Sequence, residues 1–565
     1  YEDAARCYER ALAIDPVIPG AHYRLGIALL GLGKYAESEA AARRAVEITP
    51  GHPEGWVNLG DVLQAQRRFD EALAAYQRGL ELNPGIPELL NNMGTAHRNK
   101  HSLEEASRYF ERAVEASPGF VPAQVNLSSA RLSFGLTAEA IAGFREVLEK
   151  EPRNEPAARH LLMARLYESS SAEELFEEHL AFARRFAAAA TAAPDWNAAA
   201  APGRKLRIGY VSSDLRMHPV GYNLAAVIQN HDRSAFEVHV YSNVKRPDYM
   251  TRWFQEQVDV WHSIVPLSNR AAAELIRQDQ VDILVLLAGR FDDNRPLLAI
   301  YRAAPIQVSM HDPATSGLAE MDYLIADRAL VPRHTPEKFT ERVVCLPTFF
   351  LHPPLNDAPR HAAPPVARNG WITFGSFNNP AKLNEDVVAL WARVLSSVPG
   401  SRLLLKYMDI YTVPGVRARY VSLFGQCGIG EERLIIPGEG AENRADHFSR
   451  YHQVDIALDP FPFTGSTTTF EALWMGVPVV TLEGSRMVAR WSTAMLRKAG
   501  LPQLIAGNEA EYVEIARALA ANPGELARLR AGLRSRIARS PLCAEQARTR
   551  QLERLYRRMW KIWVT

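Results

Sequence analysis

The sequence predicts an α-solenoid followed by an α/β body of two Rossmann-like, doubly wound domains. Three observations carry this prediction: a 34-residue period up to Pro152, short β-branched runs alternating with helical segments after Leu206, and a restart of that alternation after a proline-rich stretch. The predicted parts are a superhelix whose first repeat is expected to be truncated, a linker helix, a first α/β domain, an interdomain linker and a second α/β domain, bounded as 1–166, 167–203, 204–352, 353–370 and 371–565.

Prolines and small residues set the repeat. Prolines stand 34 residues apart at Pro16, Pro50, Pro84, Pro118 and Pro152, and Gly26, Gly60 and Gly94 keep the same step. Proline cannot continue a helix, so each one is expected to follow the second helix of a pair. Small residues let the two antiparallel helices approach closely. With W-V-N-L-G at 56–60, the pattern resembles the tetratricopeptide repeat.

Asparagines recur at the same step, as Asn58, Asn92 and Asn126. Each stands two residues before the small position of a first helix, and first helices line the concave face of such a superhelix. A row of amides can hydrogen-bond an extended peptide backbone without reading its sequence. We therefore expect these three residues to bind a polypeptide. The alternative is that they cap or pack within their own repeats.

Composition and charge exclude several classes of protein. The 565 residues carry 65 Lys and Arg against 64 Asp and Glu, so no global electrostatic attraction to nucleic acid or an acidic membrane is expected. The longest uninterrupted apolar run, residues 283–288, is strand-sized. Four separated cysteines suggest neither a disulfide framework nor a zinc site, and fit a cytoplasmic location.

After Leu206 the chain alternates between buried strands and helices, which implies parallel sheets covered on both faces. Two such domains place a ligand cleft at the carboxyl ends of their strands. The layout resembles the two-domain glycosyltransferase architecture called GT-B, and also some two-domain binding proteins. Strands are expected at 206–212, 236–242, 281–288, 306–310 and 322–327, and then at 371–377, 402–407, 433–438, 455–460 and 477–482.

Several motifs are missing from the sequence. It has no Walker loop and no G-x-G-x-x-G after the first strand of either domain, so kinases, P-loop ATPases and ordinary dehydrogenases are disfavoured. It has no H-E-x-x-H or paired D-x-D, and we expect neither a metal nor a resident cofactor. A diphosphate leaving group would then have to be neutralised by side chains and backbone N–H groups.

The second α/β domain offers such groups. F-G-S-F-N-N-P-A-K-L at 374–383 places amides and Lys382 after a strand, and G-S-T-T-T-F-E at 465–471 places hydroxyls directly ahead of a helix. Helix N-termini attract anions, and Glu471, one turn into the helix, can accept both hydroxyls of a ribose. Taken alone, the threonine run would be read as an ordinary helix N-cap. Together the segments predict a nucleotide-diphosphate pocket.

The repeats and these segments together resemble the O-linked N-acetylglucosamine transferase family, which includes the nucleocytoplasmic O-GlcNAc transferases and the plant SPINDLY O-fucosyltransferases. The resemblance covers essentially the whole chain, including R-A-A-P-I-Q-V at 302–308. It implies an active-site histidine at His218, within S-S-D-L-R-M-H-P. The nucleotide-sugar contacts that it implies are Asn379, Lys382, His447, Arg450, Ser466, Thr467, Thr468 and Glu471.

Departures from the family pattern leave the sugar donor open. O-GlcNAc transferases commonly have histidine before the two threonines, where this chain has Ser466, and Lys406 after L-L-L is closer to SPINDLY-type sequences. We expect UDP-N-acetylglucosamine as the donor, with GDP-fucose or another bacterial sugar nucleotide as the alternative.

The resemblance implies a metal-independent, inverting protein O-glycosyltransferase. A serine or threonine hydroxyl would attack the anomeric carbon, with His218 as proton acceptor or positioning donor and Lys382 beside the departing diphosphate. Asp214 and Asp279 are alternative bases.

Two other functions remain open from the sequence: a repeat adaptor with a silent GT-B body, and a transferase acting on a lipid or glycan. The expected partners are a polypeptide along the repeat groove and a nucleotide sugar, without nucleic acid or membrane.

Overall fold

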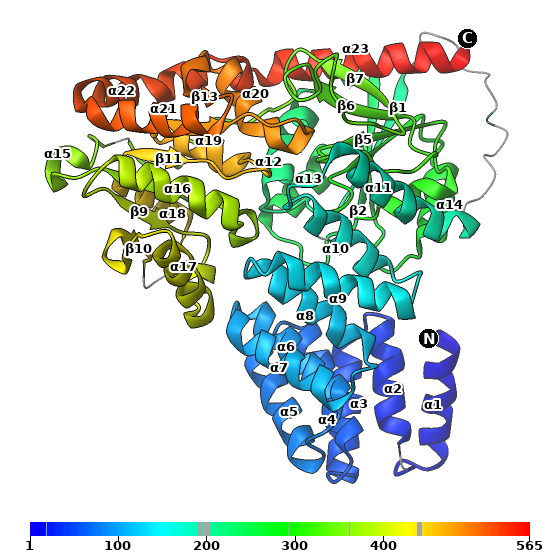
Figure 1. Cartoon of the computed structure of the whole chain (residues 1–565). Coiled ribbons are helices and arrows are strands. Elements are labelled where there is room, and N and C mark those ends of the chain that lie inside the picture. Colours follow the sequence, from blue (N-terminus) through cyan, green and yellow to red (C-terminus); the bar gives the residue numbers. More distant parts are fainter. Residues whose placement is uncertain (19, 190–195, 197–203, 292, 361, 438–442) are drawn as a thin grey trace. The chain divides into compact units, whose positions relative to one another are not determined.

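The computed structural model describes residues 1–18, 20–189, 196, 204–291, 293–360, 362–437 and 443–565 (Figure 1). The chain forms two compact units, Tyr1–Glu151 and Pro152–Thr565. The division precedes α10 (Glu155–Arg165), which the predicted boundary at residue 166 assigns to the solenoid; α10 instead contacts α11 (Ala172–Phe186) in the second unit. Most of the predicted linker beyond residue 189 lies outside the described residues.

The first unit is an antiparallel helical repeat, as predicted. Each proline of the 34-residue series follows the second helix of a pair, and the first helices α4, α6 and α8 begin with proline in their first turn. The helices are α1 (Glu2–Ile14), α2 (Ala21–Gly31), α3 (Tyr35–Ile48), α4 (Pro53–Ala65), α5 (Phe69–Leu82), α6 (Pro87–Asn99), α7 (Leu103–Ala116), α8 (Val121–Ser133) and α9 (Thr137–Lys150).

The glycines of the repeat make room for aromatic rings. A Cβ atom on Gly60 would lie 2.2 Å from the ring of Tyr76, and one on Gly94 would lie 2.6 Å from the ring of Phe110. Both rings are fully buried. Gly60 and Gly94 thus let an aromatic side chain of the second helix lie against the backbone of the first, whereas Gly26 lies against the amide of Asn58.

The second unit contains two parallel sheets. The first has the order β3-β2-β1-β4-β5-β6-β7, with helices that include α12 (Pro219–Asn230), α13 (Tyr249–Gln257) and α14 (Asn269–Gln278). The edge strands β3 and β7 are only partly buried, and neither was predicted from the sequence. The strands are β1 (Leu206–Ser212), β2 (Phe236–Ser242), β3 (Val260–Ser263), β4 (Ile283–Leu287), β5 (Ile306–Met310), β6 (Tyr323–Asp327) and β7 (Arg342–Leu346).

The second sheet has the order β10-β9-β8-β11-β12-β13, so its strand order reverses between β8 and β11. Its strands are β8 (Thr373–Ser376), β9 (Arg402–Leu405), β10 (Leu434–Ile435), β11 (Ile456–Leu458), β12 (Val479–Leu482) and β13 (Ile505–Ala506). Its helices are α15 (Val366–Asn369), α16 (Glu385–Ser397), α17 (Pro414–Gln426), α18 (Arg444–Ser449), α19 (Thr467–Trp474), α20 (Trp491–Lys498), α21 (Glu509–Ala521) and α22 (Pro523–Ala538).

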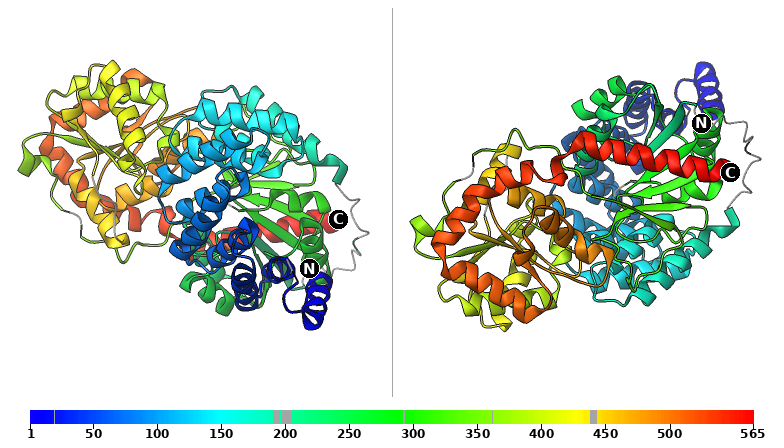
Figure 2. Two further views of the ribbon diagram at one scale, coloured as in Figure 1. Left: turned by 90° about the horizontal axis from the view of Figure 1, so that it is seen from below. Right: turned by 90° about the horizontal axis from the view of Figure 1, so that it is seen from above.

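The last helix, α23 (Glu545–Val564), packs on the first sheet although the predicted second domain runs to residue 565 (Figure 2). Glu553 accepts hydrogen bonds from His231 Nδ1 at 3.1 Å and from the backbone of Asp232 at 2.7 Å. The hydroxyl of Tyr556 lies 3.3 Å from that of Tyr210 on β1. These buried polar contacts tie the chain's end to the first domain. No helix among the described residues is both long and apolar enough to cross a bilayer.

Candidate functional site

The predicted nucleotide residues meet at the carboxyl ends of β8, β9 and β11, where the strand order of the second sheet reverses. In doubly wound sheets this reversal opens a crevice in which ligands bind. The segment after β8 supplies Asn379 and Lys382, and the segment after β11 leads through Gly465 into α19. The predicted assembly of these separate stretches on one sheet edge is therefore present in the structure.

Lys382 is held by three neighbours. Its Nζ donates to the backbone carbonyl of Thr464 at 2.9 Å and to Asn378 Oδ1 at 3.3 Å, and it lies 4.6 Å from the centre of the Phe463 ring. Burial lowers the pKa of Lys382 to about 8, although the nearby carboxylate of Asp459 opposes the shift. The side chain thus provides a positive charge at neutral pH in a partly desolvated position.

The hydroxyl run before Glu471 forms the first turn of α19. Ser466 is the N-cap residue, but its side chain accepts no capping hydrogen bond. Thr468 Oγ1 instead donates to Asn378 Oδ1 at 3.1 Å, so it shares this acceptor with Lys382. Ser466, Thr467 and Thr468 are all partly exposed. The N-terminus of α19, with Lys382 beside it, is suited to an anion.

Glu471 lies one turn further along α19. Its Oε2 is 3.1 Å from His447 Nε2 and accepts a hydrogen bond from the hydroxyl of Tyr451 at 3.3 Å. Arg450 caps the end of α18 and lies 3.8 Å from the carboxylate of Asp446. His447 and Glu471 are therefore in direct contact, and Arg450 follows His447 by three residues at the end of α18.

The structure adds three residues that the sequence argument did not place in the site. Asn378 contacts both Lys382 and Thr468, whereas the predicted Asn379 caps the short turn at Pro380–Lys382 by accepting from the backbone of Ala381. Asp459, buried at the end of β11, accepts from the backbone of Gly465 at 2.7 Å. Lys406 follows β9 and contacts His447. The sequence features that could have identified these three residues are the pair of adjacent asparagines after β8 and the polar residues that follow β9 and β11.

His218 lies after β1, at the carboxyl edge of the first sheet. It is the N-cap residue of α12, and its Nδ1 accepts from the backbone of Val220 at 3.3 Å. Asp214 Oδ1 lies 3.9 Å from the same nitrogen. A neutral histidine whose Nδ1 accepts carries its proton on Nε2, which can then only donate. The contact with Val220 fits the positioning-donor alternative for His218, whereas the Asp214 carboxylate near the same nitrogen fits the proton-acceptor alternative.

The two alternative bases occupy different edges. Asp214 is fully buried, and its carboxylate accepts from Asn294 at 2.7 Å and from Ser213 at 3.1 Å. Asp279 lies between α14 and β4, at the amino ends of the strands, where it accepts from the hydroxyl of Tyr241 at 2.6 Å. Its position on the opposite edge of the sheet argues against Asp279 as a base.

The asparagine ladder differs from an open row of amides. Asn58 is 2% exposed and donates to the backbone carbonyl of Tyr23 at 2.6 Å, which joins neighbouring repeats. Asn92 donates to Asp61 Oδ1 at 2.9 Å, and Asn126 donates to Asn91 Oδ1 at 2.8 Å; both are partly exposed. All three amides are therefore used within the solenoid, and they differ in that Asn58 is buried whereas Asn92 and Asn126 are partly exposed.

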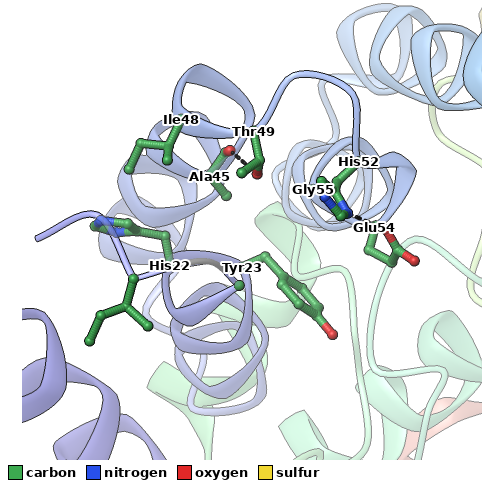
Figure 3. A pocket seen from close by; sticks show the side chains of 10 residues that line it. His22, Tyr23, Ala45, Ile48, Thr49, His52, Glu54 and Gly55 are labelled. Atoms are coloured by element: carbon green, nitrogen blue, oxygen red, sulfur yellow. Dashed lines mark hydrogen bonds and ion pairs between the residues drawn. The ribbon is translucent and has the colours of Figure 1, made fainter.

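A separate hollow lies among α2, α3 and α4, lined by residues that include Tyr23, Ile48, His52 and Glu54 (Figure 3). It contains none of the predicted site residues. Gly55 lines it at the repeat position that Leu89 occupies one repeat later, where a leucine methyl approaches Gly79. The missing leucine accounts for the space.

Among the described residues, no group of three or more His, Cys, Asp or Glu side chains is arranged to hold a metal ion. At the second sheet the structure brings Lys406, His447 and Glu471 into contact with one another. Lys382 contacts Asn378, which also accepts from Thr468 in the first turn of α19.

Family models match most of the chain. The model described as Glycosyl transferase family 41 matches residues 189–356 and 366–552, and tetratricopeptide repeat models match residues 1–53, 53–85 and 91–158.

Curated relatives are similar over about two thirds of the chain. The chain is 38% identical over 395 residues to the "Probable UDP-N-acetylglucosamine--peptide N-acetylglucosaminyltransferase SPINDLY" of Solanum lycopersicum, covering 69% of this chain and 42% of the relative. It is 29% identical over 377 residues to the SEC protein of Arabidopsis thaliana, and the match covers 64% of this chain and 37% of that protein. The chain thus spans about two fifths of the length of these relatives.

A solved structure is similar over nearly the whole chain. The structure of a lysine-to-methionine mutant of the Thermobaculum terrenum O-GlcNAc transferase superposes with a TM-score of 0.86 at 34% identity, covering 93% of this chain and 98% of that one. The likeness extends over both units of the chain.

Proposed function

Because the chain belongs to glycosyl transferase family 41, we propose that it transfers a sugar from a nucleotide sugar to serine or threonine hydroxyls of polypeptides. The observation that carries the proposal is the convergence of Lys382 and the hydroxyl-bearing first turn of α19 on Asn378. These groups offer a positive charge, hydroxyls and a helix N-terminus to a diphosphate. The tetratricopeptide repeats, matched by their own family models, fit a polypeptide acceptor.

In the proposed reaction the acceptor hydroxyl oxygen forms a bond to the anomeric carbon while the bond from that carbon to the diphosphate oxygen breaks. Attack from the face opposite the leaving group inverts the anomeric centre. Lys382 neutralises the negative charge that develops on the diphosphate, and Glu471 holds the ribose hydroxyls. His218, as an Nε2–H donor, orients the donor sugar or the acceptor. The acceptor's proton passes to solvent.

We propose UDP-N-acetylglucosamine as the donor, since the names of the relatives and of the solved structure refer to N-acetylglucosamine transfer. GDP-fucose remains the second candidate, because Ser466 and Lys406 are closer to the motifs of SPINDLY-type sequences. No divalent cation is needed in this proposal, since side chains and the α19 N-terminus supply the diphosphate's partners. The four free cysteines fit a reaction in the reducing cytoplasm.

Intact-mass analysis of a target protein incubated with several nucleotide sugars tests the proposal. A mass increase of one N-acetylhexosamine supports it, and a deoxyhexose increase selects the GDP-fucose alternative. Hydrolysis or transfer to a glycan or lipid with an unmodified protein target would instead assign another acceptor. Complete absence of turnover would support a silent adaptor.

A further inference from the structure

Lys406 is a buried cation that the proposed chemistry does not use. It directly follows β9, is 5% exposed, and is anchored by its backbone N–H, which donates to the carbonyl of Ser376 at 3.1 Å. Its Nζ lies 3.1 Å from His447 Nδ1 and 5.6 Å from the centre of the Phe377 ring. A lysine at this depth needs a specific partner, and the imidazole supplies it.

The contact decides where His447 carries its proton. An ammonium group can only donate, so His447 Nδ1 accepts and Nε2 bears the hydrogen. Nε2 then donates to Glu471 Oε2 at 3.1 Å, the same oxygen that accepts from Tyr451. Among the described residues, the other carboxylate oxygen of Glu471 accepts no hydrogen bond and remains available to a ligand. Lys406, His447 and Glu471 thus form a directed chain of hydrogen bonds.

We propose that Lys406 is a positioning residue for the nucleotide: it fixes the Nε2–H tautomer and ring orientation of His447, which holds Glu471 for the ribose hydroxyls. Lys406 acts through His447, because its own side chain is buried. The inference rests on the proposed nucleotide site, since Glu471 is the ribose ligand only if a nucleotide binds there.

The test compares Lys406→Met and Lys406→Arg with Lys205→Met, which removes an exposed lysine outside the site. Isothermal titration with UDP and with GDP, together with initial rates, separates binding from turnover. Lys406→Met should raise Kd and KM for the nucleotide about tenfold with kcat within about twofold, since it removes a charged hydrogen bond. Lys406→Arg should recover most of the affinity, because arginine also donates, and Lys205→Met should match wild type.

A double-mutant cycle distinguishes positioning from a general loss of stability. In a His447→Ala background, Lys406→Met should cause no further loss of nucleotide affinity. A second loss as large as the first would overturn the proposal.

The tautomer of His447 can be measured in the wild-type protein, so this test does not depend on whether a variant folds. Nitrogen-15 NMR should report His447 as the Nε2–H tautomer, and an Nδ1–H tautomer would overturn the proposal. Binding of neither UDP nor GDP by wild type would overturn the nucleotide site itself. Normal wild-type binding that is unchanged in Lys406→Met would overturn the role of Lys406 alone.

Discussion

The ammonium of Lys382 donates to the backbone carbonyl of Thr464 across a distance of 2.9 Å. Lys382 follows β8, whereas Thr464 lies between β11 and α19, so this bond joins the two segments that flank the reversal of strand order. Thr464 is itself fixed, because its side chain donates to the carbonyl of Val488 at 2.8 Å. The cation is therefore positioned beside the α19 N-terminus before any ligand arrives.

Lys382→Met should lower kcat by two to three orders of magnitude. Removing one group that stabilises developing charge costs about 3–4 kcal/mol in the transition state. Methionine retains the apolar stem against Phe463, so the melting temperature should stay close to that of wild type. Steady-state rates and a thermal melt on one preparation check both statements. Turnover close to wild type would remove Lys382 from the mechanism.

Activity should decline at alkaline pH. Burial lowers the pKa of Lys382 to about 8, so the ammonium is the main form below that pH and the neutral amine above it. Because the neutral amine cannot offset diphosphate charge, kcat/KM should fall about tenfold per unit well above pH 8. Residual activity of Lys382→Arg should lack this decline, since guanidinium stays charged. A wild-type profile that is flat to about pH 10 would contradict the assignment.

Turnover should persist in excess EDTA. Lys382, Thr467 and Thr468 provide the proposed diphosphate contacts, and none of them requires a bridging cation. The measurement is the initial rate after exhaustive chelation. Loss of activity that Mg²⁺ or Mn²⁺ restores would show that the diphosphate contacts are incompletely assigned.

The asparagines of the repeat should separate into two classes. Asn58→Ala should lower the melting temperature, because it removes a buried 2.6 Å hydrogen bond and leaves the Tyr23 carbonyl without this donor, at a cost of about 1–3 kcal/mol. Asn92→Ala with Asn126→Ala should raise KM for full-length protein acceptors roughly five- to a hundred-fold if each contact is worth about 0.5–1.5 kcal/mol.

Hydrolysis of the nucleotide sugar is the control for that experiment. It should be unchanged in the Asn92→Ala, Asn126→Ala protein, because the described nucleotide-site residues all belong to the second unit. An unchanged KM for protein acceptors, together with a lower melting temperature, would assign these two asparagines to packing as well.

The solenoid and most strands were predictable because each leaves a local signature. The prolines mark helix ends wherever the repeat recurs, and runs such as residues 283–287 are buried on both faces of a parallel sheet. Strands β3 and β13 left no such signature, since one is partly exposed and the other spans two residues. The docking of α23 on the first sheet depends on contacts with residues more than 300 positions away, such as Glu553 with His231.

The site was predictable at the level of segments, less so at the level of single contacts. The threonine run and Lys382 were identified because hydroxyls before a helix and a lysine after a strand suit an anion. Asn378 could not be distinguished from Asn379, because only the folded chain shows which amide faces Thr468. Lys406 and His447 lie 41 positions apart, and their hydrogen bond arises from the packing of α18 against the sheet edge.

The most direct test of the account is the intact mass of a protein acceptor after incubation with UDP-N-acetylglucosamine and either wild-type enzyme or Lys382→Met. Wild type should add one or more N-acetylhexosamine units, in EDTA as well as without it, and the folded variant should add almost none. Equal modification by both proteins, or no sugar added by wild type from UDP-N-acetylglucosamine, GDP-fucose or any other nucleotide sugar supplied, would contradict it.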